Sequence, residues 1–184
     1  MTAPHVERVQ RSFSRSFESY HAAAGQQARI ADRLVQELCD SGAPRSFGSA
    51  LELGCGTGHL TQRLCTEFGF GALTLNDLSP EARQTADATG AAFLCGDATG
   101  VAWPKRPDLI ASSSMIQWLP DPAGFLRKAA GALAPGGWLA VSGFGPGQYR
   151  ELVRIGSSAK APGLCQARDL GSAVQDDLDV VTTG

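Results

Sequence analysis

The chain lacks the features that would tie it to a metal centre, a disulfide framework or a membrane. Its five cysteines are an odd number and form no C-x-x-C pair, so we expect reduced thiols and no zinc ribbon. No apolar run approaches the length of a membrane span, and residues 1–15 lack the apolar centre of a signal peptide. A net charge of -2 argues against a nucleic-acid-binding fold. We expect one cytoplasmic, monomeric domain without a metal site or internal repeats.

What the sequence does contain is a glycine-rich stretch between an apolar run and an amphipathic segment. Residues 51–61 read LELGCGTGHLT, and Leu60, Leu64 and Phe68 follow at helical spacing. The order predicts a strand, a tight turn and a helix. Glycine lacks a Cβ, so such a turn lets the backbone approach a ligand, and the helix N-terminus offers unpaired N–H groups to a negative group.

One position separates this turn from a dinucleotide site. The dinucleotide fingerprint G-x-G-x-x-G would need glycine where His59 stands, so a nicotinamide oxidoreductase ranks last among the candidate functions. Glu52, an acidic residue, stands two places before the first glycine. The string E-L-G-C-G-T-G resembles the first motif of the class I S-adenosylmethionine-dependent methyltransferases, whose ligand carries an amino acid and a sulfonium instead of a pyrophosphate.

Two carboxylates follow the next two predicted strands. The run 72–76 ends at Asp77-Leu78-Ser79-Pro80, and Asp77 follows the last glycine by roughly the 20 residues expected of a ribose-binding acid. Its alternative role is capping a helix, for which Ser79 with Pro80 in first position is also suited. The run 92–95 ends in Gly96-Asp97-Ala98. Ligands collect outside the carboxyl ends of parallel strands, so Asp97 could accept a hydrogen bond from an adenine amine or be an ordinary loop residue.

The second half of the core repeats the unit of strand and helix. A fourth strand, 107–112, opens into residues 113–119, where Trp118 is either core or part of a wall between cofactor and substrate. A helix starting at Asp121-Pro122 and a P-G-G turn lead to a fifth strand, 138–142. Residues 49–143 therefore predict an α/β fold with a doubly wound, mostly parallel, Rossmann-like sheet.

Helices precede and follow this core. Residues 6–18 and 26–39 predict two N-terminal helices, and residues 1–45 are expected to form a lid. Arg8, Arg11 and Arg15 share one face of the first helix, either as a solvated surface or as a docking patch for an acidic partner. After 143 we expect helices over 148–155 and 168–174 and a final strand over 178–181.

Motif order narrows the resemblance to one subfamily. The segments that carry it lie between about residues 8 and 181, and they are FESY at 17–20, QARIADRL at 27–34, NDLSP at 76–80, SSSMIQWL at 112–119 and FGP at 144–146. They resemble the malonyl-acyl-carrier-protein O-methyltransferases of biotin synthesis. The resemblance implies methylation of the free carboxylate of a malonyl group held on the carrier's phosphopantetheine.

The resemblance also implies a set of site residues. S-adenosyl-L-methionine would be held at its methionine end by the loop Gly54 to Gly58, at its ribose by Asp77 and at its adenine by Asp97, with Ser112 and Ser113 lining the methyl-transfer channel. The full set of expected cofactor residues is Tyr20, Gln27, Glu52, Gly54, Cys55, Gly56, Gly58, Asp77, Leu78, Asp97, Ala98, Ser112 and Ser113. Trp118, Arg150 and Arg154 are the candidate substrate residues.

The chain departs from the family at its C-terminal part. Class I methyltransferases usually finish with an antiparallel strand pair, and the residues after 143 suffice for one of the two. Residues 144–184 are therefore expected to be a truncated end, which would leave the fifth strand with an unpaired, aggregation-prone edge.

A carboxylate acceptor needs no general base, because its pKa near 4 leaves it ionised at pH 7. We therefore assign no catalytic residue and regard the three histidines as incidental. Two alternatives to the carrier-protein enzyme stay open. One is a small-molecule O- or C-methyltransferase of the same fold, and the other is a cofactor-binding but inactive domain.

Overall fold

The computed structural model describes residues 25–148 and 161–182. In chain order its elements are α2 (Gly25–Asp40), β1 (Ser46–Leu53), α3 (His59–Glu67), β2 (Gly69–Asp77), η1 (Pro80–Ala82), α4 (Arg83–Thr89), β3 (Ala92–Cys95), β4 (Leu109–Ser113), η2 (Ile116–Trp118), α5 (Pro122–Ala132), β5 (Trp138–Ser142) and α7 (Ala167–Ser172). None of the described helices is both long and apolar enough to span a bilayer. All five cysteines are free thiols.

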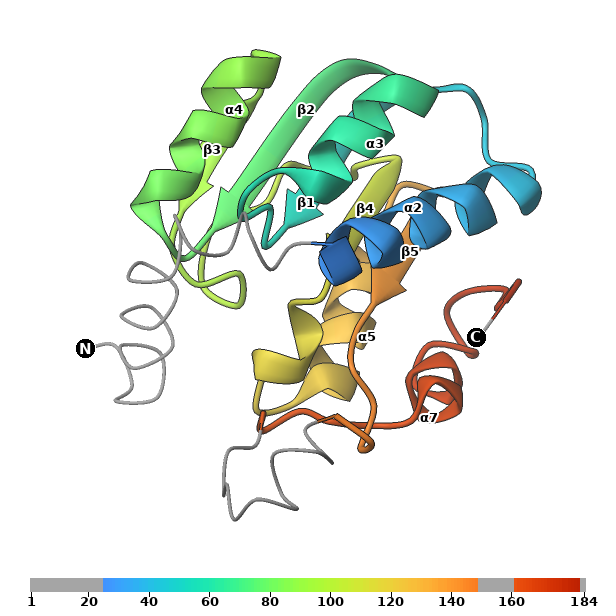
Figure 1. Cartoon of the computed structure of the whole chain (residues 1–184). Coiled ribbons are helices and arrows are strands. Elements are labelled where there is room, and N and C mark those ends of the chain that lie inside the picture. Colours follow the sequence, from blue (N-terminus) through green and yellow to red (C-terminus); the bar gives the residue numbers. More distant parts are fainter. Residues whose placement is uncertain (1–24, 149–160, 183–184) are drawn as a thin grey trace.

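The five strands form one parallel sheet in the order β3-β2-β1-β4-β5. The predicted doubly wound α/β sheet is confirmed. The chain builds outward from β1 in one direction through β2 and β3, then returns to place β4 on the other side of β1 (Figure 1). Strand order therefore reverses between β1 and β4, and such a switch point opens a crevice at the carboxyl ends of the strands.

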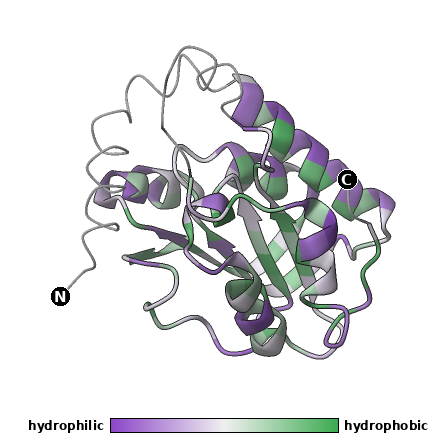
Figure 2. Ribbon diagram, turned by 90° about the horizontal axis from the view of Figure 1, so that it is seen from below, coloured by the Kyte–Doolittle hydropathy of each residue, from purple (hydrophilic) through white to green (hydrophobic). Residues whose placement is uncertain are grey.

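Side chains of the central strands point alternately to the two faces of the sheet, so each face has its own hydrophobic core. Ala50 of β1 and Leu109 of β4 belong to the cluster that packs α2 and α3, whereas Leu51 and Ile110 belong to the cluster beneath α5. The helices around the sheet carry both hydrophilic and hydrophobic residues (Figure 2), and their apolar side chains pack on the strands. Successive residues of a strand point to opposite faces, so an apolar run covered by helices on both sides is buried throughout.

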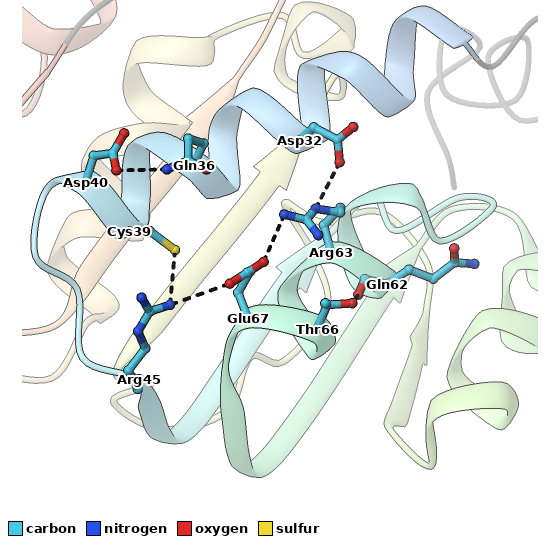
Figure 3. Close-up of polar contacts among 9 residues, drawn as sticks. All are labelled: Asp32, Gln36, Cys39, Asp40, Arg45, Gln62, Arg63, Thr66 and Glu67. Atoms are coloured by element: carbon cyan, nitrogen blue, oxygen red, sulfur yellow. Dashed lines mark hydrogen bonds and ion pairs between the residues drawn. The ribbon is translucent and has the colours of Figure 1, made fainter.

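Helix α2 is attached to α3 by a surface network of charges (Figure 3). Arg63 of α3 pairs with Asp32 of α2 at 2.9 Å and with Glu67, one turn further along α3, at 3.0 Å. Arg45 extends the network, because it pairs with Glu67 at 3.5 Å and donates to Cys39 Sγ at 3.7 Å. Exposed pairs contribute little free energy singly, so the apolar cluster that Val35 of α2 shares with Leu64 of α3 contributes more to holding the two helices together.

One local prediction is confirmed only in part, and a second is wrong. Ser79 stands at the N-cap of η1 with Pro80 at the start of the helix, as predicted, but its side chain makes no capping bond and donates to Glu81 instead. The backbone N–H of Ser79 donates to Asp77 Oδ1 at 2.8 Å. The predicted final strand over 178–181 is absent, because Leu178 packs on the cluster between α5 and α7 while Val180 and Val181 are exposed.

Some of the remaining helix predictions fall on residues that the structure describes, and the others fall outside those residues. The predicted helix 26–39 is confirmed as α2, and the one at 168–174 as the shorter α7. The predicted helix 6–18 with its three arginines lies outside the described residues, as does all of 149–155 in the predicted helix 148–155. The lid of residues 1–45 and the division into three parts remain predictions.

Candidate cofactor and substrate site

A cavity of about 610 Å³ opens at the carboxyl ends of β1, β2, β3 and β4, beside the switch point. Its walls come from the loops that follow these four strands, with contributions from the first two turns of α2, the start of α3, and α5. The volume lies within the range of about 300–1,000 Å³ that is usual for small-molecule sites. The fold therefore brings the residues predicted from four separate motifs to one place.

The glycine turn forms the cavity wall after β1. Its three glycines differ in what surrounds their Cα atoms. All three have positive φ, of 74° at Gly54, 49° at Gly56 and 85° at Gly58. A Cβ on Gly54 would lie 2.6 Å from Met115 Cγ, and one on Gly58 would lie 2.7 Å from Thr85 Cγ2. A Cβ on Gly56 would meet nothing within 4 Å. Packing thus requires Gly54 and Gly58, while Gly56 presents bare backbone toward open space.

Asp77 stands at the end of β2 and is tied to the glycine turn. Its Oδ2 accepts the N–H of Gly56 at 2.8 Å, and its Oδ1 accepts that of Ser79 at 2.8 Å. Burial raises the pKa of Asp77, and the backbone N–H groups of Ser79, Gly56 and Leu78 lower it in part. A carboxylate oxygen can accept more than one hydrogen bond, so both oxygens keep capacity for hydroxyl donors.

Glu52 lies in the wall beneath the glycine turn and is 1% exposed. Burial raises its pKa to about 8, the Thr61 side chain lowers it, and the charge of Asp77 raises it further. Its Oε2 has no hydrogen-bond partner among the described residues. A buried carboxyl group with an unused acceptor at a cavity wall suits a cationic ligand group, which would lower the cost of ionising it.

The loop after β3 supplies the third acidic position. Asp97 is half-buried, and its Oδ1 accepts from both the N–H and the hydroxyl of Thr99 at 2.8 Å. Asp97, Ala98 and Thr99 all line the cavity. Hydrogen bonds within the loop therefore fix the orientation of the Asp97 carboxylate.

The segment after β4 forms the wall on the other side of the glycine turn. Ser113, Ser114, Met115 and Trp118 line the cavity. Ser114 has a positive φ of 58° and donates its N–H to the carbonyl of Ser142 in β5 at 3.0 Å. That left-handed residue ends the strand and turns the chain back over the cavity toward η2, so Met115 and Trp118 become wall residues.

The predicted site residues fall into three groups. Gln27, Glu52, Gly54, Cys55, Gly56, Asp77, Leu78, Asp97, Ala98, Ser113 and Trp118 line the cavity. Gly58 and Ser112 do not: Gly58 packs on Thr85, and the buried Ser112 donates its hydroxyl to the carbonyl of Leu53 at 2.8 Å. Tyr20, Arg150 and Arg154 lie outside the described residues. Which of these residues contact a ligand remains a prediction.

Sequence reasoning missed several residues of the wall. His59, regarded as incidental, lines the cavity from the first position of α3, and its place directly after the last glycine could have signalled this. Asp121, the N-cap of α5, and Lys128 within α5 also line the cavity. No spacing in the sequence indicates that α5 approaches the loop after β3, because that proximity arises only when α5 packs on the sheet.

The cavity-forming segment coincides with a match to a known family. A family profile described as a methyltransferase domain matches residues 51–141. Malonyl-[acyl-carrier protein] O-methyltransferases from Haemophilus ducreyi and Porphyromonas gingivalis are 32% and 34% identical to the chain over 155 and 149 residues. These alignments cover 80% and 81% of the chain but 60% and 58% of the relatives. The chain thus spans about three fifths of the length of the curated relatives it matches.

Solved structures share the architecture at lower sequence identity. The DhpI-SAM-HEP complex matches with a TM-score of 0.70 and 18% identity over 100% of this chain and 96% of that chain. N-methyltransferase NodS from Bradyrhizobium japonicum WM9, in complex with S-adenosyl-L-homocysteine, matches with a TM-score of 0.66 and 19% identity over 91% and 84%. At such identities the likeness establishes the fold alone.

Proposed function

We propose, from the premise that this chain belongs to the class I S-adenosylmethionine-dependent methyltransferases, that it methylates the free carboxylate of malonyl-acyl-carrier protein. The observation that carries methyl transfer is the meeting of the glycine turn, Glu52, Asp77 and Asp97 around one cavity at the switch point. The acceptor is supported by identities of 32% and 34% to relatives of that name.

The residues present fit S-adenosylmethionine chemically. The unpaired Oε2 of Glu52 suits the ammonium of the methionine end, and the acceptor-only carboxylate of Asp77 suits two vicinal ribose hydroxyls. The bare backbone at Gly56 leaves room for close approach of the ligand. Asp97 would accept from the adenine amine, and Tyr20 and Gln27 would close over the cofactor.

When bound, S-adenosylmethionine supplies an electrophilic methyl group on its sulfonium. Glu52 and Asp77 would hold the donor's two ends at fixed positions, and the wall of Met115, Trp118 and Leu119 would exclude water from the acceptor. The acceptor carboxylate is already ionised at pH 7, so no side chain has to remove a proton from it. Catalysis would come from alignment and from a dry surrounding.

An anionic acceptor also needs a cationic guide. Arg150 and Arg154 are proposed for this role, and Arg8, Arg11 and Arg15 for docking the acidic carrier, on sequence position alone. Arg150→Ala and Arg154→Ala should raise KM for the malonyl acceptor while leaving KM for the cofactor unchanged. An equal rise in both constants would contradict the role proposed for the arginines.

The proposal is tested by incubating the chain with S-adenosylmethionine and malonyl-acyl-carrier protein, and following the acceptor by mass spectrometry. We expect one added methyl group on the malonyl carrier and none on the acetyl carrier, which lacks the free carboxylate. Asp77→Asn is the catalytically impaired control. A chain that binds S-adenosylhomocysteine yet methylates neither carrier would contradict the acceptor and leave the family assignment intact.

One observation favours a second candidate, a small-molecule O- or C-methyltransferase. The described cavity wall carries the carboxyl groups of Glu52, Asp77, Asp97 and Asp121 but only one lysine, Lys128. Acidic side chains outnumber basic ones in this wall even with Glu52 uncharged, and this excess favours an uncharged acceptor over an anionic one. Methylation of a phenol in the same assay, with the malonyl carrier unmodified, would select this candidate.

A further inference from the structure

The loop after β3 is a tight turn organised around Asp97. The carbonyl of Asp97 accepts the N–H groups of Gly100 and Val101 at 2.9 and 3.0 Å. Together with the two bonds from Thr99 to the Asp97 side chain, these contacts fix the shape of the turn. The first residue of the loop is anchored to the end of β2, because the N–H of Gly96 donates to the carbonyl of Asp77 at 2.8 Å and Asn76 Nδ2 donates to the carbonyl of Gly96 at 2.9 Å. The contacts around Asp97 join residues within the loop, so they do not fix the position of its far part, residues 98–101, relative to the rest of the protein.

Trp103 ties this turn to the body of the protein. Its indole Nε1–H donates to the carbonyl of Ala98 at 3.0 Å. The ring stands edge-on to Phe125 of α5, with centroids 5.6 Å apart and an interplanar angle of 78°. Phe125 is 6% exposed and packs in the core, so the indole has a rigid support on one side and holds the loop on the other.

Lys128, one turn further along α5, contacts both the loop and Trp103. Its Nζ donates to the carbonyl of Thr99 at 2.9 Å and lies 4.2 Å from the centroid of the Trp103 ring. One ammonium group therefore bonds the loop and also stacks on the indole that bonds the adjacent carbonyl. The cation–π contact and the hydrogen bond restrain the loop and Trp103 together.

We propose that Trp103, with Lys128, is a positioning residue that sets selectivity for the nucleobase of the cofactor. Trp103 does not line the cavity, so it acts through the carbonyl of Ala98 on the placement of Asp97. A carboxylate in that place accepts from the 6-amino group of adenine, whereas the 6-oxo group of hypoxanthine has no donor to offer it. The inference rests on the proposed cofactor site, and it assigns a positioning role to Trp103, behind the cavity wall, and to Lys128, which lines the cavity.

The test compares the dissociation constants of S-adenosylhomocysteine and S-inosylhomocysteine by calorimetry in the whole chain. We expect the unmodified chain to prefer the adenine ligand by about tenfold or more, the range of a hydrogen bond to a charged group. Trp103→Phe keeps an aromatic ring against Phe125 but removes the N–H donor. We expect it to lower the preference by about threefold or more.

Two further variants separate positioning from general destabilisation. Trp138→Phe makes the same chemical change at the start of β5, where the indole packs on the opposite face of the sheet, and should leave the preference unchanged. Lys128→Met removes the bond to Thr99 from an exposed position and should lower the preference in the same direction as Trp103→Phe. Lys128→Met carries the test if Trp103→Phe does not fold.

The outcomes distinguish this inference from the proposed function. Binding of S-adenosylhomocysteine with an adenine preference that neither Trp103→Phe nor Lys128→Met reduces would overturn the inference and leave the function standing. A folded chain that binds neither ligand would overturn both. A preference reduced equally by Trp138→Phe would show that the effect follows stability, and it too would overturn the inference.

Discussion

Glu52 is a buried acidic residue whose pKa lies far from its value in water. Its side chain is 1% exposed, and burial raises its pKa from 4.5 to about 8, so the carboxyl group is neutral in the free protein at pH 7. A buried strand normally carries apolar side chains, yet Glu52 lies between Leu51 and Leu53 at the end of β1. A carboxyl group at this position would favour ligand binding, but its burial lowers the free energy of unfolding.

The raised pKa predicts how stability depends on pH. A carboxyl group with a higher pKa in the folded state stabilises fully below 4.5, and this contribution is lost as pH rises toward about 8. The free energy of unfolding should therefore fall with a slope of up to about 1.4 kcal/mol per pH unit in that window. Urea unfolding of Glu52→Gln should show a shallower slope, which retains only the contribution of other groups such as Asp77, whose pKa is also raised by burial.

The control for that series is Glu37→Gln, which removes a partly exposed carboxyl group from α2. It should keep the pH dependence of the unmodified chain. If Glu52→Gln and the unmodified chain show parallel dependence on pH, the carboxyl group of Glu52 is not the source of the slope.

At the scale of elements, the glycine turn is clamped between β2 and α4. The N–H of Gly56 donates to Asp77 Oδ2 at 2.8 Å, and the carbonyl of Gly56 accepts from Thr85 Oγ1 at 2.9 Å. The methyl group of Thr85 also packs where a side chain on Gly58 would stand. A single threonine on α4 thus holds the backbone of the turn in the conformation that faces the cavity.

Thr85→Val tests the clamp, because valine keeps the methyl contact and loses the hydroxyl donor. We expect a loss of about 1 kcal/mol in unfolding free energy and a several-fold weaker binding of S-adenosylhomocysteine, since the turn loses its preorganisation. Both quantities are measured on the same preparation, by denaturant titration and calorimetry.

Thr89→Val is the matched control from the last turn of the same helix. The hydroxyl of Thr89 bonds the carbonyls of Thr85 and Ala86 within α4 and does not touch the turn. It should leave ligand affinity unchanged. Equal affinities for Thr85→Val and Thr89→Val would show that the Thr85 hydroxyl does not prepare the turn for the ligand.

Helices and strands could be predicted from the sequence where the local residue pattern and the tertiary packing favour the same structure. The apolar runs at 92–95 and 138–142 match β3 and β5, and Asp121 caps α5 by accepting the N–H of Gly124 at 2.8 Å. At Ser79 the predicted cap position is correct but the capping bond is missing, because the Ser79 hydroxyl donates to Glu81. Prediction was wrong at 178–181 because Leu178 had an alternative partner in the helices.

At the scale of the whole molecule, residues 161–178 pack against the elements that form one wall of the cavity. The N–H of Gly163 donates to the carbonyl of Gln117 at 2.8 Å, and a Cβ on Gly163 would lie 2.4 Å from the carbonyl oxygen of Leu119. Further on, Leu170, Val174 and Leu178 pack on α5. The segment 161–178 thus stabilises η2 and α5, which carry cavity residues, without entering the cavity.

Val174→Ala should show this support as a change in stability alone. Val174 is 6% exposed against Leu126 and Ala130, so truncation should cost about 1 to 2 kcal/mol in unfolding free energy. Affinity for S-adenosylhomocysteine, measured well below the unfolding transition, should not change. Val180→Ala, at a side chain 44% exposed, should alter neither quantity, and a cost as large as that of Val174→Ala would contradict the packing argument.

The sheet and the part of the cavity at the strand ends could be predicted, because each strand ends in its own short motif and parallel strands bring those ends together. Asp77 and Asp97 were identifiable from the sequence for this reason. Trp103, Lys128 and Thr85 were not, because each acts on a loop across packed elements. Contacts between elements leave no periodic signal in a single sequence.

The central claim is that this cavity binds S-adenosylmethionine through Asp77. The measurement that tests it most directly is calorimetric titration of S-adenosylhomocysteine into the chain and into Asp77→Asn, with circular dichroism as the check of folding. We predict one site of micromolar affinity in the unmodified chain and binding weakened by about tenfold or more in Asp77→Asn. A folded chain that binds no ligand, or that binds it equally with and without Asp77, would contradict the claim.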